Sequence, residues 1–174
     1  MNDCLAGSHA ISINFHDKKP MEPTTILVVD DDLAFTEILA LRLGKRGFNV
    51  LTAEAGEAGL KVLDQGDFID VVVLDMAMPG MDGLETLKML KKKQPLVEVL
   101  MLTGQSTVTT AVEAIKWGAF NYLTKPCDIE DLSAFLEEAA NHRKNRQAKI
   151  LEVRMTPYLS PQKREQLIAD ILKE

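Results

Sequence analysis

Short apolar runs alternate with segments of helical spacing over most of the chain, from residue 26 to about residue 141. The apolar runs predict five strands, at residues 26–29, 49–53, 71–74, 97–102 and 121–124. The segments between and after them predict five helices, at residues 33–46, 57–64, 83–92, 107–117 and 129–140. The runs at 26–29 and 71–74 are apolar at every position, which is typical of strands that helices cover on both faces. The pattern therefore predicts a doubly wound α/β domain around a five-stranded parallel sheet.

Both ends of the chain lack this alternation. Residues 1–23 contain several Gly, Ser and Pro residues and no sustained period, so we interpret them as a disordered leader. Residues 24–142 form the predicted domain. Residues 143–174 form a predicted helical tail, in which Pro157 stops one helix and Ser160 with Pro161 begins a second.

The tail is basic, although the chain as a whole is acidic. Residues 141–174 hold eight Lys and Arg against four Asp and Glu, and four of the basic residues cluster at Arg143, Lys144, Arg146 and Lys149. Helical spacing continues into the tail from the preceding helix, along Ile129, Leu132, Leu136, Ala139, Arg143, Arg146, Ile150 and Val153. The tail is either an amphipathic appendage, folded back or solvated, or a helix that dimerises, or a segment that docks a partner.

Composition narrows the class of protein. The chain has 174 residues and a formal net charge of −6, so we do not expect it to bind nucleic acid through a diffuse basic surface. Two cysteines are too few for a disulfide scaffold. No apolar run approaches the ~20 residues that cross a bilayer, and the first residues lack the features of a secretory signal. We therefore expect a cytoplasmic protein that does not associate with membranes.

Polar residues follow the predicted strands at their carboxyl ends. Asp30 and Asp31 follow the first strand, Asp75 the third, Thr103 the fourth and Lys125 the fifth. Because the carboxyl ends of parallel strands meet at one edge of a sheet, these groups are expected to surround one crevice. Clustered carboxylates suit Mg²⁺, with Mn²⁺ as the other candidate, and a dication with donor groups suits a phosphoryl group. Asp75, on the central strand, is the best candidate for a carboxylate nucleophile.

Four motifs at these strand ends, in this order, resemble the receiver domain of bacterial two-component response regulators. They are Val28-Val29-Asp30-Asp31, Leu74-Asp75-Met76-Ala77-Met78-Pro79-Gly80-Met81-Asp82-Gly83, Leu102-Thr103-Gly104 and Tyr122-Leu123-Thr124-Lys125-Pro126. The resemblance covers residues 24–142 and implies a flavodoxin-like strand order 2-1-3-4-5, as in chemotaxis regulators. It also implies a cis bond between Lys125 and Pro126.

The resemblance also implies a role for each site residue. Asp75 accepts a phosphoryl group from a sensor histidine kinase or a phosphotransfer protein. Asp30, Asp31, Asp75 and the Ala77 carbonyl hold Mg²⁺, and Lys125 and Thr103 contact the phosphoryl oxygens. Thr103 and Tyr122 form a switch pair.

The resemblance implies that phosphorylation changes the conformation of one face of the domain. This face is formed by the fourth helix, fifth strand and fifth helix, at residues 107–140. That face or the tail would mediate homodimerisation or control an unknown downstream protein. The chain would then be a signalling phosphoacceptor rather than an enzyme, catalysing only its own phosphorylation and slow dephosphorylation. In the family, two positions tune the rate at which the phosphoryl group is hydrolysed, and here they are Ala77 and Gln105. We expect slow loss of phosphate because Ala77 has no side chain that can orient a water.

Two other functions stay open. An aspartate-nucleophile phosphatase needs Asp-x-Asp after its first strand, and Asp30 and Asp32 satisfy that spacing. A stand-alone transcription regulator is the other, with the basic tail as its contact to DNA.

Overall fold

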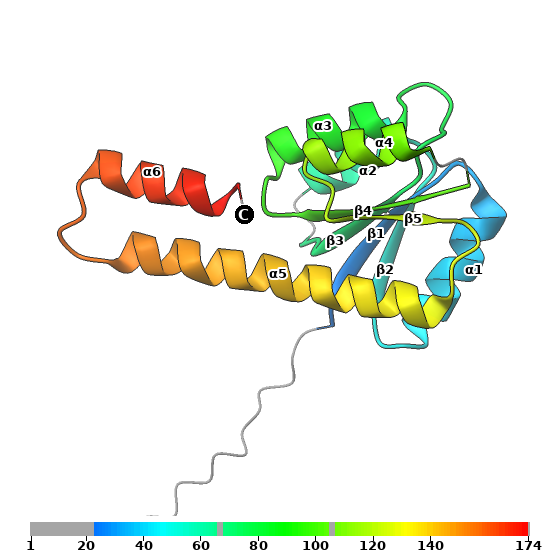
Figure 1. Ribbon diagram of the computed structural model, residues 1–174. Helices are drawn as coiled ribbons and strands as arrows, with labels where there is room; N and C mark the ends of the chain where they lie inside the picture. The colour runs from blue at the N-terminus through cyan, green and yellow to red at the C-terminus, as the bar shows by residue number, and fades with distance from the viewer. Residues whose placement is uncertain (1–22, 66–67, 105–106, 174) are drawn as a thin grey trace, which may run out of the picture.

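A computed structural model describes residues 23–65, 68–104 and 107–173 of the chain. Five parallel strands form one sheet in the order β2-β1-β3-β4-β5 (Figure 1). The strands are β1 (Thr25–Val29), β2 (Asn49–Ala53), β3 (Val71–Leu74), β4 (Glu98–Thr103) and β5 (Asn121–Thr124). This is the order that the resemblance implies, so the predicted fold class is confirmed. The predicted leader, residues 1–23, lies outside the described residues except for its last position.

In the part of the chain that the structure describes, six helices accompany the sheet. They are α1 (Leu33–Gly44), α2 (Gly56–Asp64), α3 (Gly83–Lys93), α4 (Val108–Lys116), α5 (Ile129–Met155) and α6 (Pro161–Ile171). Three of them begin at the aspartates that follow apolar strands or turns: the carboxylates of Asp32, Asp82 and Asp128 each accept a backbone N–H of the first turn. These caps fix where each helix leaves the edge of the sheet.

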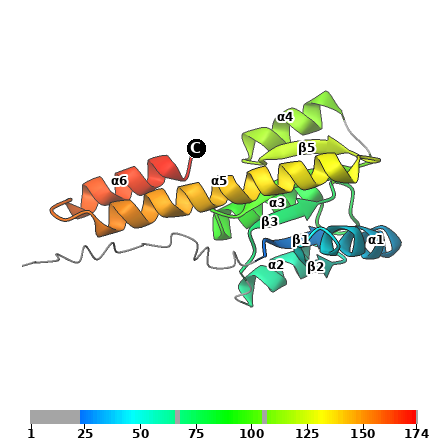
Figure 2. The ribbon, with the colours of Figure 1, turned by 90° about the horizontal axis from the view of Figure 1, so that it is seen from below.

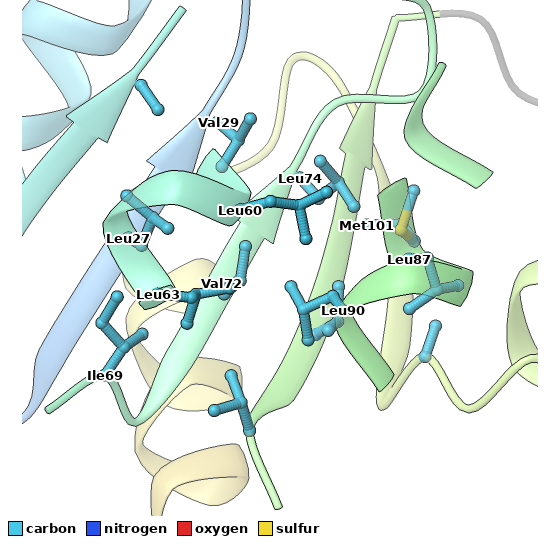
Figure 3. Close-up of a cluster of buried hydrophobic side chains, with 14 of the residues drawn as sticks. Leu27, Val29, Leu60, Leu63, Ile69, Val72, Leu74, Leu87, Leu90 and Met101 are labelled. Atoms are coloured by element: carbon cyan, nitrogen blue, oxygen red, sulfur yellow. The ribbon is translucent and has the colours of Figure 1, made fainter. Parts of the chain in front are cut away.

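Helices cover both faces of the sheet, as the uninterrupted apolar strands predict. Side chains from α2, α3 and α4 pack with Leu27, Val72 and Met101 in one core cluster, part of which Figure 3 shows. Side chains from α1 and α5 pack on the opposite face with Ile26 and Val73. Successive strand residues therefore point into different cores, which explains why alternation is missing from β1 and β3.

The fourth strand lies one residue later than its apolar run predicts. The run begins at Val97, but the ladder begins at Glu98, which pairs with Val71, and extends to Thr103, which pairs with Thr124. The displacement brings Thr103 inside the sheet and puts a buried acid at the first position of β4.

The tail is helical, and α5 runs without a break across residues 142 and 143. It continues well beyond the sheet, and α6 returns along it (Figures 1 and 2). The helix ends at Met155, two residues before Pro157, and Ser160 caps α6 with Pro161 in its first turn, as predicted. Among the described residues, no helix combines the length and apolar character needed to cross a membrane.

Candidate functional site

The sheet itself holds the backbone of the predicted site residues. Asp30 and Asp75 are the first residues after β1 and β3, and their N–H groups still donate to Ala53 and Val29 of the neighbouring strands, at 3.1 and 2.9 Å. The Lys125 N–H donates in the same way to the Thr103 carbonyl, at 2.8 Å. Asp30, Asp75 and Lys125 therefore occupy fixed positions at the carboxyl ends of β1, β3 and β5.

Lys125 joins the two buried carboxylates. Asp30 and Asp75 are 3% and 5% exposed. The Lys125 ammonium hydrogen-bonds to Asp30 Oδ2 and forms an ion pair with Asp75 Oδ1 at 3.0 Å. The other oxygens accept backbone donors, Asp30 Oδ1 from the Asp32 N–H at 3.0 Å and Asp75 Oδ2 from the Ala77 N–H at 2.7 Å. Each carboxylate is thus oriented through both of its oxygens.

A ring that sequence reasoning missed completes the surroundings of the ammonium. The Lys125 Nζ lies 4.3 Å from the centroid of the Phe35 ring, close enough for a cation–π interaction. Phe35 comes from the first turn of α1, directly after the Asp32 cap. An aromatic residue in the turn after the acidic triplet was the available signal, but nothing in its spacing linked it to Lys125.

Burial and charge shift two of these groups in the same direction. Burial raises the pKa of Asp30, even though Lys125 and the Asp32 N–H act against that rise. Burial alone would lower the pKa of Lys125, but its contacts with Asp30 and Asp75 outweigh burial and raise that pKa. The lysine is therefore held as a cation, while burial disfavours the charged form of Asp30.

The remaining predicted residues lie around this centre. Thr103 is fully buried at the end of β4, and Asp31 and Ala77 are exposed at the edge. Tyr122 of β5 is partly buried, with its hydroxyl 3.2 Å from the Thr110 Oγ1 of α4. The bond between Lys125 and Pro126 is cis, as the resemblance implies.

The third aspartate of the triplet has a structural role. The exposed carboxylate of Asp32 accepts the Phe35 N–H at 3.0 Å and caps α1. Within residues 23–65, 68–104 and 107–173, no group of three or more Asp, Glu, His or Cys side chains is placed to hold a metal ion. At the centre of the site, two buried carboxylates therefore share one partly buried ammonium.

Comparison with known proteins agrees with this geometry. The family model described as response regulator receiver domain matches residues 26–137, which contain all of the predicted site residues. The chain belongs to this family. As a receiver domain, it is a component of the response regulators of bacterial two-component systems.

Relatives and solved structures support the assignment. The receiver is 45% identical over 117 residues to the transcriptional regulatory protein ZraR of Escherichia coli, a match that covers 67% of this chain and 26% of ZraR. A receiver domain protein from Clostridium thermocellum matches 70% of this chain and 98% of its own, with 37% identity and a TM-score of 0.67. The beryllofluoride-activated NtrC4 receiver domain dimer matches 68% and 98%, with 34% identity and a TM-score of 0.65. The chain spans about a quarter of the length of the curated relatives it matches.

Proposed function

We propose that this receiver takes a phosphoryl group on Asp75 from a sensor histidine kinase or a phosphotransfer protein and thereby controls a partner protein. The observation that supports this most directly is the contact of one ammonium with two buried carboxylates at the carboxyl edge of the sheet. A cytoplasmic location, expected from the sequence, is part of the same proposal.

Transfer to Asp75 uses a carboxylate that is already oriented. One oxygen of Asp75 attacks the phosphorus, the new oxygen–phosphorus bond forms, and the bond from phosphorus to the donor nitrogen breaks with its electrons on the nitrogen. The Ala77 N–H holds Oδ2 at 2.7 Å, and Lys125 lies 3.0 Å from Oδ1. Lys125 and the Thr103 hydroxyl then donate to the phosphoryl oxygens and stabilise their charge.

The donor set fits a hard dication. Asp30 and Asp75 supply buried carboxylates, the exposed Asp31 and Ala77 lie at the same edge of the sheet, and every donor that we propose is an oxygen. Mg²⁺ keeps several waters in such sites, so two carboxylates and a carbonyl suffice as protein ligands; Mn²⁺ takes the same donors. When bound, the ion offsets the negative charge of the acids and of the incoming phosphoryl group.

The switch that we propose links the site to α4, β5 and α5. Thr103 shifts toward the phosphoryl oxygens, and Tyr122 turns into the space that this shift leaves, changing the packing of α4. Tyr122 already contacts α4 through Thr110. The outer face of α4 carries exposed Val108, Val112 and Ile115, which suits it to contact a second receiver or a downstream protein.

The two other functions have less support. A phosphatase of the aspartate-nucleophile class needs a free acid at the position of Asp32, and here that acid caps α1. Slow self-dephosphorylation is therefore the turnover that we expect of this receiver. Contact with DNA through the tail has less support because Arg143 and Arg146 are buried.

Intact-mass measurement after incubation with acetyl phosphate and Mg²⁺ tests the proposal. We expect the wild type and Asp32→Asn, which keeps a good capping residue, to gain one phosphoryl group. Asp75→Asn is expected to gain none. Equal labelling of wild type and Asp75→Asn, or no labelling of the wild type, would contradict the proposal.

A further inference from the structure

Two buried arginines attach α5 to the amino-terminal edge of the sheet, the edge opposite the phosphorylation site. Arg143 pairs with Asp70, just before β3, at 3.2 Å, and Arg146 pairs with Glu98, at the start of β4, at 2.7 Å. All four side chains are less than a tenth exposed. The basic cluster in the tail is therefore not a surface patch, since half of it neutralises acids inside the domain.

Glu98 is the centre of the larger of these two networks. It is 2% exposed and also accepts from the His142 Nδ1 at 2.9 Å and from the Lys91 Nζ at 3.2 Å. Burial would raise the pKa of Glu98, but its cationic neighbours outweigh burial and lower it. The acid therefore stays ionised and binds Arg146 through a charge-assisted hydrogen bond.

Arg146 differs from Arg143 because it also reaches α6. Its Nε and one terminal nitrogen donate to the Ile171 and Leu172 carbonyls, at 3.3 and 3.0 Å, and the same terminal nitrogen donates to the Pro95 carbonyl at 3.1 Å. The last carbonyls of a helix lack partners within the helix and carry partial negative charge, so a buried guanidinium satisfies both needs. One side chain thus joins β4, the loop before it and the end of α6. Arg143, in contrast, contacts Asp70, Gln147 and the Phe68 ring.

The docked end of α6 faces the last turn of α4 across a cavity. Leu172 and Lys173 line this cavity of about 610 Å³ together with Ile115, Lys116 and Trp117. The cavity is also lined by Lys91, in the last turn of α3, and by Arg146, which donates to the end of α6. These cations offset the partial negative charges at the carboxyl ends of the helices, so we do not interpret the cavity as an anion site. We call it the joint between α4 and α6. Trp117, 49% exposed, is the only tryptophan in the sequence.

We propose that Arg146 is a latch that docks α6 against the receiver, and that docking of α6 and the position of the last turn of α4 are coupled. If α6 leaves, Arg146 keeps its charge but loses the two carbonyls that neutralise part of it, so undocking costs free energy at the latch. The coupling is reciprocal by linkage: a change at α4 that widens the joint weakens docking of α6. A link from phosphorylation to α6 rests in addition on the proposed function.

Conservative variants of the full chain separate the latch from the ion pairs. Arg146→Lys keeps a cation for Glu98 but lacks the planar group that reaches three elements, and Arg143→Lys is the matched control on the same helix face. Ile171→Ala loosens α6 from its own side and leaves the buried network intact. Hydrogen exchange of residues 161–173 and acrylamide quenching of Trp117 are measured for each.

We expect Arg146→Lys to speed exchange in α6 by roughly tenfold or more, because α6 loses hydrogen bonds to one charged donor. We expect Ile171→Ala to speed it by a similar factor because a buried side chain loses its apolar contacts. Both variants should increase quenching of Trp117. Arg143→Lys is expected to change neither. The latch is overturned if the two lysine variants behave alike, and the coupling is overturned if α6 exchange rises while quenching of Trp117 stays constant.

Adding beryllofluoride with Mg²⁺ tests whether activation of the phosphorylation site reaches Trp117 and α6. We expect it to change both Trp117 fluorescence and α6 exchange in the wild type. A response of Trp117 without any response of α6 counts against the coupling and leaves the proposed function standing. No response at either place contradicts the proposed function, whereas the latch is then decided by the variants.

Discussion

Replacing Lys125 by methionine tests the electrostatic design of the site. The ammonium touches Asp30 and Asp75, and its side chain is 21% exposed. Methionine keeps most of the length of the side chain but removes the charge, and with it the cation–π interaction with the Phe35 ring. Two nearly buried carboxylates are then left next to each other without a cation.

The expected loss of stability follows from these contacts. Hydrogen bonds to charged groups contribute about 1.5–3 kcal/mol each, and removing one partner of a buried pair costs about 3–5 kcal/mol. Because Lys125 is partly exposed, we expect the lower end, a loss of about 3 kcal/mol in the free energy of unfolding by urea without Mg²⁺. Lys61→Met, on the exposed face of α2, is the control and is expected to change stability by less than about 0.5 kcal/mol.

Added Mg²⁺ separates this explanation from a general packing defect. The ammonium occupies carboxylate oxygens that we propose as metal ligands, so its removal should increase the stabilisation that Mg²⁺ gives. If Lys125→Met unfolds within about 1 kcal/mol of the wild type, or if Mg²⁺ stabilises both proteins equally, our account of the site is wrong.

Three further results are expected. Glu98→Gln should lower the free energy of unfolding by about 3 kcal/mol, against less than about 1 kcal/mol for the surface control Glu113→Gln. Burial raises the pKa of Glu98, but its cationic neighbours outweigh burial and lower it. The contribution of Glu98 to the free energy of unfolding is therefore complete above the pKa of an unfolded glutamate. In urea titrations at several pH values, the difference between wild type and Glu98→Gln should shrink as the pH falls through that lowered pKa; a constant difference would contradict this. Ala77→Asn should speed loss of phosphate, measured by intact mass over time, because the amide can orient a water; an unchanged rate would argue against that role. Gly83→Ala should cost about 1–3 kcal/mol and reduce labelling of Asp75, because the added Cβ would lie 2.1 Å from the Asp75 carbonyl oxygen; full labelling would contradict it.

The central strands could be predicted from the sequence because β1, β3 and β4 are buried on both faces. Continuous apolar runs at β1 and β3 indicate such strands, and capping aspartates mark the starts of α1, α3 and α5. The predicted start of β4 is one residue too early because the apolar Val97 precedes Glu98, the first residue of the ladder. Hydrophobicity alone cannot assign a buried glutamate to a strand.

The positions of the site residues follow from topology, but their partners do not. Parallel strands bring Asp30, Asp75 and Lys125 to one edge whatever their separation in sequence, and the structure places them in contact there. The Phe35 contact and the two arginine pairs depend on how helices pack, and the arginine pairs join residues 48 and 73 positions apart. The sequence shows that Arg143 and Arg146 lie on the apolar face of a helix, but it does not show that they pair with Asp70 and Glu98.

The continuous fifth helix bears on where this protein can be divided. The family model ends at residue 137, yet Asp70 and Glu98 inside that span take their neutralising charges from Arg143 and Arg146 beyond it. A fragment trimmed to the family boundary would enclose two acids with fewer counter-charges, and a hybrid regulator joined at that point would inherit the same deficit. The smallest transplantable unit of this receiver therefore extends through Arg146.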